Sequence, residues 1–390
     1  MTLAFTWTDK SLEELVVNGD ISYGIVQPGV DSPSGVPIVR VKDIRSGRID
    51  QRSPLRVRPQ LSDRYRRTLL EGGELLVSIV GTVGESAVVP KEMAGWNVAR
   101  AVAVVRPLGV SADWIRLCLE TSAVKHALAG VLNTTVQSTL NLADLKRLAI
   151  PVPPPAEREA IVEVLGALDD KIAANAKLVE SAGSLSAATF ASMLTATDSM
   201  PLTAVASFIN GKAFTKNATG TGRVVIRIAE LNSGIGGSTV YNDLDVPEQH
   251  LARPGDLLFA WSGSLTLHRW YRPEGIVNQH IFKVFPTAGY PMWCVHRLIA
   301  RKLDEFKSIA ADKATTMGHI QRRHLDEPVN VPSQSKIRSH DAVMSALWER
   351  ALAAEQESLT LEATRDALLP QLMSGKIRVK AAEKSVGEAL

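Results

Sequence analysis

A dense group of basic residues occurs near the start of this 390-residue chain. Between Val36 and Arg67 the only acidic residues are Asp43, Asp50 and Asp63. The basic residues of this stretch are Arg40, Lys42, Arg45, Arg48, Arg52, Arg56, Arg58, Arg64, Arg66 and Arg67. Arginine forms forked hydrogen bonds with phosphate oxygens and with guanine. The stretch therefore indicates either a polyanion-binding surface or an ordinary solvated face.

Catalytic signatures are missing from the sequence. It contains no phosphate-binding G-x-x-x-x-G-K-[ST], no H-E-x-x-H, no G-x-S-x-G, and no G-x-G-x-x-G between a strand and a helix. It also lacks the (Asn/Asp)-Pro-Pro-aromatic motif that marks an adenine methyltransferase. The eight histidines do not cluster at metal-ligand spacing, and the glycine-rich segment 233–237 is interpreted as a turn. We therefore expect no catalytic residue, no metal site and no cofactor bound by this chain.

Composition narrows the class of protein further. A hydrophobic content of 45% and a net charge of +3 are typical of a globular protein. No run of 18 apolar residues occurs, so a transmembrane helix is not expected. The first ten residues lack a secretory pattern, and Cys118 and Cys294 lie far apart. We therefore expect a cytoplasmic protein with two buried thiols.

The chain repeats itself once, in the same order of motifs. The offset between repeats shrinks from 187 to 179 positions, as loops of different length in duplicated units would produce. The matching pairs are 39–47 with 226–234, 73–77 with 255–259, Trp114 with Trp293, and the segments after Ala156 and Ser335. Each repeat begins with short β-branched runs bounded by glycine, such as 85–89, 102–105 and 281–285, which predict strands. Helices are predicted over 114–128 and 293–306.

Each repeat ends in a predicted long helix. Apolar or small residues recur in alternating steps of three and four from Ile161 to Met193, and again from His340 to Leu372. A proline segment precedes each helix and can open it. A helix of this length cannot bury its stripe in one small globule, so we expect the two helices to pair antiparallel. The fold class predicted is mixed α/β: two similar globules alternating with two long helices that form an antiparallel coiled coil. The predicted boundaries are globule 1–155, helix 156–198, globule 199–332, helix 333–375 and tail 376–390.

The chain resembles a known family, the specificity subunits of Type I restriction-modification systems. The resemblance covers essentially the whole length and rests on motifs at 255–258, at 140–149 running into 150–154, and at 368–377. Two segments depart from the family pattern. The first half has Ala99-Arg100-Ala101 where the second has Asn278-Gln279-His280, and Glu157 stands where glutamine is common.

The resemblance implies a DNA-reading function without catalysis. Each globule would be a target-recognition domain that reads one half of a split, asymmetric site in double-stranded DNA. The helices would dock two methyltransferase subunits, which bind S-adenosylmethionine, and would set the spacer between the half-sites. Restriction and translocase subunits, which use ATP and Mg, could join this complex, and no membrane would be involved.

The candidate DNA-binding residues occupy comparable segments of the two repeats. In the first half they are Arg40, Lys42, Arg45, Arg48, Arg100 and the loop 81–84 with Thr82. In the second half they are Lys212, Arg227, Ser262, Ser264, Gln279 and His280. Small polar loops before the last strand of each globule add Thr134, Thr135 and Gln137, and Thr315, Thr316 and His319; Arg322 and Arg323 follow. For any single residue, ordinary turn chemistry or a solvated surface is the alternative interpretation.

Two other classes of function stay open from the sequence. One is a two-domain scaffold that binds RNA or protein and dimerises through its helices. The other is a nuclease that uses scattered carboxylates in one globule. The target sequence itself depends on loop geometry.

Overall fold

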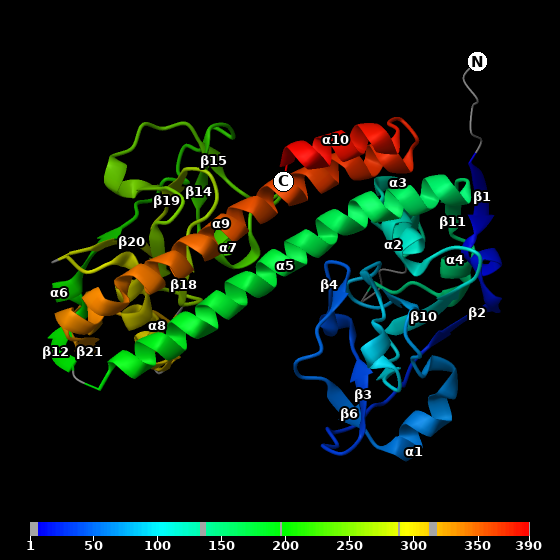
Figure 1. Ribbon diagram of the computed structural model, residues 1–390, viewed down its shortest axis with the longest axis horizontal. Helices are drawn as coiled ribbons and strands as arrows, with labels where there is room; N and C mark the ends of the chain where they lie inside the picture. Colours follow the sequence, from blue (N-terminus) through cyan, green and yellow to red (C-terminus); the bar gives the residue numbers. More distant parts are fainter. Residues whose placement is uncertain (1–6, 133–137, 196, 288, 312–317, 390) are drawn as a thin grey trace. The chain divides into compact units, whose positions relative to one another are not determined.

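The computed structural model describes residues 7–132, 138–195, 197–287, 289–311 and 318–389. It divides the chain into two compact units (Figure 1). Unit 1 comprises Met1–Asp169 and Ala363–Leu390, and unit 2 comprises Asp170–Glu362. Each unit therefore combines one globule with part of each long helix.

An antiparallel four-stranded sheet forms the centre of unit 1. Its order is β2-β10-β7-β8. The strands are β2 (Val16–Tyr23), β10 (Val102–Pro107), β7 (Leu75–Ser78) and β8 (Ser86–Val88). Beside it lie the sheet β6-β3-β9 (Leu55–Val57, Val36–Val39, Asn97–Val98), the ribbon β1-β11 (Thr8–Ser11, Ala149–Val152) and the hairpin β4-β5 (Ile44–Arg45, Arg48–Ile49). The β-branched run of β10 suits a strand buried on both faces.

Unit 2 repeats this arrangement. Its main sheet has the order β13-β20-β17-β18 (Ala206–Asn210, Ile281–Pro286, Leu257–Ala260, Thr266–Arg269). The second sheet is β15-β14-β19-β16 (Tyr241–Asn242, Arg223–Ile226, Gly275–Val277, Leu251–Ala252), and the ribbon is β12-β21 (Thr197–Pro201, Pro328–Pro332). In both second sheets one pair is parallel, β3 with β9 and β14 with β19. The strands predicted over 85–89, 102–105 and 281–285 are β8, β10 and β20.

Helices complete both units. The longer ones are α2 (Ala112–Glu120), α3 (Ser122–Gly130), α5 (Pro155–Met193), α8 (Met292–Ala311), α9 (Gln334–Met373) and α10 (Val379–Ala389). The short ones are η1 (Leu12–Leu15), η2 (Val41–Asp43), α1 (Pro59–Ser62), η3 (Asp63–Thr68), η4 (Lys91–Met93), α4 (Leu142–Lys146), α6 (Leu202–Val205), α7 (Ile228–Ser233), η5 (Glu248–His250) and η6 (Arg322–Leu325). No helix in the described part of the chain is both long and apolar enough to cross a membrane.

The long helices pair antiparallel inside each unit. In unit 1, Arg365 of α9 contacts Asp169 of α5. In unit 2, Asn175 Nδ2 donates to a Glu357 carboxylate oxygen at 2.8 Å. Among the predicted stripe residues, those with 9% exposure or less are Ile161, Leu165, Leu168, Asn175, Ala182, Ser186 and Met193 on α5, and Met344, Ala351, Ala354, Leu361, Leu368 and Leu372 on α9. The predicted fold class is confirmed.

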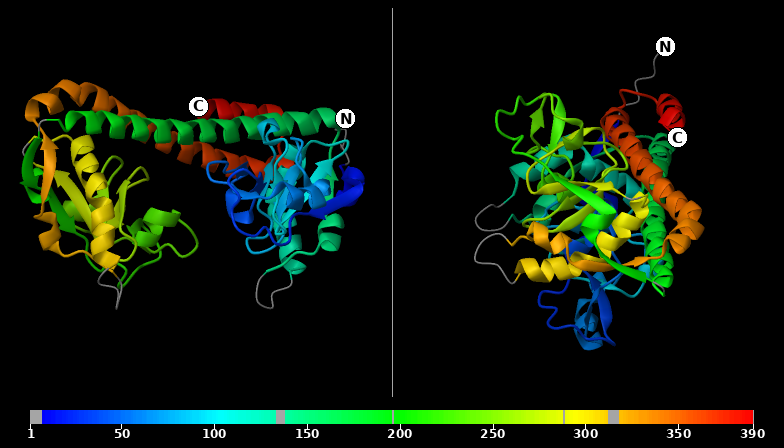
Figure 2. Two further views of the ribbon diagram at one scale, coloured as in Figure 1. Left: turned by 90° about the horizontal axis from the view of Figure 1, so that it is seen from below. Right: turned by 90° about the vertical axis from the view of Figure 1, so that its left-hand side faces the viewer.

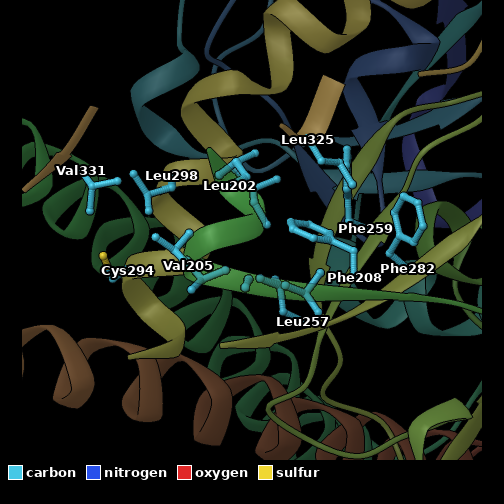
Figure 3. Packing of buried hydrophobic residues seen from close by; sticks show 14 of the residues in the cluster. Leu202, Val205, Phe208, Leu257, Phe259, Phe282, Cys294, Leu298, Leu325 and Val331 are labelled. Carbon is cyan, nitrogen blue, oxygen red and sulfur yellow. The ribbon is translucent and has the colours of Figure 1, made fainter. Parts of the chain in front are cut away.

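The core of unit 2 shows how a long helix is held to its globule. Phe208, Phe259 and Phe282 of the main sheet pack with Leu298 of α8 (Figure 3). Phe190 of α5 belongs to the same buried cluster. The globule packs against one side of the helix pair (Figure 2). The stripe is therefore buried partly by the partner helix and partly by the sheet.

Two elements differ from the sequence prediction. The helix predicted over 114–128 is interrupted at Thr121, which has extended backbone and whose hydroxyl accepts a hydrogen bond from Val124 N as the cap of α3. The segment predicted as a tail contains α10, in which Ala382 is fully buried. Gly375, with a φ of +66°, allows the turn between α9 and α10.

Candidate nucleic-acid interface

The main sheet of unit 2 gathers predicted residues at one edge. The strand β13 ends at Asn210 and β17 ends at Ala260, whereas the antiparallel β20 begins at Ile281. The loops that follow β13 and β17 and the loop that precedes β20 therefore meet at the same edge.

Backbone hydrogen bonds join these loops. The Gln279 amide donates to the Lys212 carbonyl at 2.9 Å, and Ser262 and His319 form an antiparallel bridge. Ser264 is exposed beyond this bridge. The structure thus brings together five of the residues predicted in the second half, and His280 follows Gln279 directly.

An aromatic cluster occupies the centre of this edge. The Trp261 ring lies 5.2 Å from the His280 ring and 6.4 Å from the His319 ring, centroid to centroid. Its indole N–H donates to Asn210 Oδ1 at 2.8 Å, and its amide donates to the His280 carbonyl at 3.1 Å. His280 has a φ of +72°, which is uncommon outside glycine. The edge therefore presents stacking surfaces and hydrogen-bonding groups side by side.

The corresponding edge of unit 1 has the same backbone connections. The Arg100 amide donates to the Ile25 carbonyl at 2.8 Å, as Gln279 does to Lys212. The Gly81 amide donates to the Ser138 carbonyl at 3.0 Å, and Thr82 is exposed in the same loop. Arg100 and Thr82 are therefore placed as Gln279 and Ser264 are in unit 2.

Several predicted residues cannot be placed on either edge. Thr134, Thr135, Gln137, Thr315 and Thr316 lie outside the described residues. Arg322 is exposed on η6, and its guanidinium donates to the Phe208 carbonyl of β13 at 3.4 Å.

Arg40 and Arg227 have a structural role that the sequence analysis did not assign to them. The Arg40 guanidinium donates to both carboxylate oxygens of Asp43, at 2.8 and 2.9 Å, and to the Ser53 carbonyl. Arg227 makes the equivalent fork with Glu230, at 3.0 and 2.6 Å. Each guanidinium is already engaged within its own loop. Their predicted role in DNA binding stays a prediction, and a DNA contact would have to compete with these bonds.

Four other basic residues of the first stretch line an open hollow of about 740 Å³, as does Arg40. The four are Lys42, Arg45, Arg48 and Arg52. Hydrogen bonds from Arg52 lower the pKa of Asp50 to about 2, so this carboxylate stays charged beside them. The hollow adjoins the hairpin β4-β5, which pairs with β8 through Gly47 and Ala87, and Arg48 donates to the Asp169 carbonyl of α5 at 3.0 Å. These residues lie at the side of the sheet, apart from the strand ends that carry Arg100.

A second basic hollow lies near β2, and the sequence did not predict it as a site. It measures about 590 Å³, and its lining includes Tyr23, Arg64, Arg66 and Arg67. Tyr23 is 46% exposed and ends β2, as Asn210 ends β13. The arginines were visible in the basic run, but nothing in the sequence marked Tyr23, Asn210 or Trp261.

Two further features of the described residues concern possible metal ligands and thiols. Within those ranges no three His, Cys, Asp or Glu side chains form a group that could hold a metal ion. Cys118 and Cys294 are free and buried, as predicted. Burial raises the pKa of both thiols, that of Cys294 to about 12.

Comparison with known proteins finds relatives for part of the chain. Residues 8–181 match the model of the Type I restriction modification DNA specificity domain. This match covers less than half of the chain. The chain is also 30% identical over 159 residues to the Type I restriction enzyme EcoBI specificity subunit of Escherichia coli. That match covers 40% of this chain and 33% of the relative, so it spans about one third of the relative's length. The resemblance seen in the sequence is confirmed.

One solved structure shares the fold of this chain. The crystal structure of the Type-I restriction-modification system S subunit from M. genitalium aligns with a TM-score of 0.61 at 13% identity, over 95% of this chain and 97% of that chain. The HsdS subunit from Thermoanaerobacter tengcongensis aligns with a TM-score of 0.38 at 15% identity, over 97% and 99% of the two chains.

Proposed function

We propose that this chain is the non-catalytic DNA-specificity subunit of a Type I restriction-modification complex. Each globule reads one half of a split, asymmetric site in duplex DNA. The paired helices dock two methyltransferase subunits, which bind S-adenosylmethionine, and set the spacer. Restriction and translocase subunits that use ATP and Mg join the same complex.

One observation carries the proposal: the two edges share backbone hydrogen bonds but differ in side chains. Arg100 stands where Gln279 stands in the other unit, and each is hydrogen-bonded through its amide to the loop after the neighbouring strand. A shared scaffold with different exposed groups is what two readers of two different half-sites require.

The residues divide by the contact they make. Arg100, Thr82, Ser264, Gln279 and His280 reach base edges, because they lie on the loops at the strand ends. Arg45, Lys42 and Arg52 bind backbone phosphates, because they are exposed around an open hollow and carry an excess of positive charge. Phosphate contacts supply affinity, and contacts to base edges supply choice of sequence.

The helices offer apolar surface for docking. Leu185 on α5 is 54% exposed and Val343 on α9 is 58% exposed. Lys336 of α9 donates to the Met193 carbonyl of α5. Because the helices are antiparallel, Leu185 and Val343 therefore lie at about the same level along the pair in unit 2. Large apolar side chains exposed on a helix pair are typical of an interaction site.

The test is co-expression with the cognate methyltransferase subunit. We expect methylation of adenine in a split site that depends on S-adenosylmethionine and on both proteins. Methyl transfer by the purified chain alone would contradict the proposal. A Leu185→Arg/Val343→Glu variant should reduce co-purification of the methyltransferase, whereas Arg350→Glu, at an exposed position of α9, should not.

Salt dependence and magnesium separate this function from its rivals. Duplex DNA binding should weaken steeply as salt rises, with log K falling linearly against log salt. A protein-binding scaffold lacks this slope for DNA, and an RNA-binding scaffold prefers RNA in competition. Cleavage of DNA by the isolated chain with magnesium would identify a nuclease.

A further inference from the structure

A hollow of about 240 Å³ lies inside unit 2, where the long helices meet the globule. It is lined by α5, α8, α9 and the segment from β18 to Tyr271. The three helices and β18 are labelled in Figure 1. From α5 it receives only small or apolar side chains, among them Gly183 and Ser186. The charged groups all come from the other three elements: Arg269, Arg297 and Glu355.

The two arginines of the hollow differ in their partners. Arg269 donates to Glu355 Oε2 at 2.8 and 3.0 Å and to the Trp348 carbonyl at 3.0 Å, and it lies 4.6 Å over the Trp348 ring. Arg297 has no hydrogen-bond or ion-pair partner among the described residues, and its Nε is buried. The hollow is therefore lined by two guanidinium groups and one carboxylate, which pairs with Arg269.

The groups around Arg297 do not neutralise its positive charge. Burial lowers the pKa of Arg297, and the charge of Arg269 lowers it further. His296, next to Arg297, also lines the hollow, and its buried Nδ1 has no hydrogen-bond partner. A buried cation or polar group without a partner is costly, so such groups are normally paired.

We propose that this hollow binds a phosphate-type oxyanion. The planar fork of Arg297 matches two oxygens of such an ion. Ser186 of α5 and His296 of α8 also line the hollow and supply further polar atoms. The anion neutralises the second guanidinium. It is either free inorganic phosphate or a phosphodiester of bound DNA, since both present the same oxygens.

Calorimetric titration of the full chain with inorganic phosphate and with sulfate tests the site, with chloride as the control for ionic strength. We expect saturable binding of both oxyanions and an upward shift of the melting temperature with phosphate. Arg297→Gln should weaken this binding at least roughly tenfold, because it removes a charge-assisted contact. Arg301→Gln, at an exposed position of the same helix, should bind phosphate as the wild type does.

Melting temperatures test the site independently, in case the substitution itself changes the stability of the protein. Without phosphate, Arg297→Gln should melt no lower than the wild type, because the substitution removes a half-buried charge that has no partner among the described residues. Phosphate should then raise the melting temperature of the wild type and leave that of Arg297→Gln unchanged. Equal phosphate shifts in both proteins, or no binding by the wild type, would overturn the site.

Duplex DNA distinguishes the two sources of the oxyanion. If a DNA phosphodiester occupies the hollow, DNA should compete with inorganic phosphate, and Arg297→Gln should reduce the slope of log K against log salt by about 1. If free phosphate is the ligand, the slope should not change. The phosphate titration needs no DNA, so its outcome is independent of the proposed DNA-reading function.

Discussion

The strand-end edges of the two units have the same backbone connections but carry different side chains. In unit 2 the edge centres on Trp261 with two histidine rings and Asn210. In unit 1 the position of Trp261 is taken by Ile79, whose amide donates to the Ala101 carbonyl at 2.8 Å. The hydrogen bonds that shape the loops come from the main chain, so side chains can change without altering the scaffold. This separation predicts that each unit can be altered without affecting what the other reads.

Exchange of one globule gives the largest expected effect. Replacing 199–332 with the corresponding segment of a relative should replace one half of the methylated sequence completely and leave the other half unchanged. Sequencing of methylated adenines in genomic DNA measures this. A change in both halves would contradict independent reading.

The helices should control the spacer and not the half-sites. Adding one heptad at matched positions in α5 and α9 keeps the packed stripe nearly in register, with a drift of only ~20°. It lengthens the pair by ~10 Å at 1.5 Å per residue. At 3.4 Å per step this corresponds to about three base pairs, and because helix tilt and DNA bending reduce the gain we expect two or three. Methylation mapping should show unchanged half-sites with a longer gap. An active variant with the original gap would refute the helix pair as a ruler.

The junctions between helices and globule differ more than the edges do. In unit 1, Arg365 of α9 contacts both Glu120 and Asp169, and Arg116 donates to the same two acids at 2.6 and 2.7 Å. In unit 2 the junction is built from Arg269, Glu355 and Trp348 instead. Removing one member of a buried ionic network leaves unpaired charge behind.

Arg365→Met should therefore lower the free energy of unfolding of unit 1 by roughly 3–5 kcal/mol. Arg350→Met, at an exposed position of the same helix, should change it by less than about 0.5 kcal/mol. Denaturant unfolding measures both. A loss for Arg365→Met that does not exceed its control would show that the network contributes nothing.

The sequence predicted the scaffold better than the site. The repeat, the strands and the long helices were visible because burial imposes periodic patterns that local residues record. The break at Thr121 was missed because helical periodicity continues across it, although threonine before serine is a capping signal. The fork of Arg40 could have been found, since an acid stands three residues after the arginine in both repeats. The cluster of Trp261, His280 and His319 could not, because it joins three loops that are distant in the sequence.

Single residues at the edges should have smaller and local effects. Arg100→Ala should weaken recognition of the first half-site, and Gln279→Ala that of the second, each by roughly 1–3 kcal/mol if the side chain contacts a base edge. Binding to a panel of duplexes with single base changes in each half-site measures the loss. Arg45→Ala should instead weaken binding to all sequences equally and reduce the salt slope by about 1.

Arg40→Ala is the matched comparison, because its guanidinium is bonded to Asp43. It should lower thermal stability without a selective effect on one base. A selective loss at one base position for Arg40→Ala would show that the guanidinium leaves Asp43 to contact DNA.

The smallest effect concerns pH and only one unit. Burial, followed by the charges of Arg297 and Arg269, lowers the pKa of His296 to about 3. An unfolded histidine titrates near ~6.5, so below that pH the unfolded chain binds a proton that the folded chain does not. Folding stability therefore falls as pH decreases from about 6.5. Between pH 6.5 and 5.5 this one group should contribute a loss of about 1 kcal/mol in folding stability.

His296→Phe, which keeps a ring against Trp348, should show a smaller loss of stability over that interval in phosphate-free buffer. His126→Phe, at an exposed position of α3, should retain the wild-type slope of stability against pH. Identical slopes for the wild type and His296→Phe would mean that His296 becomes protonated in the folded protein.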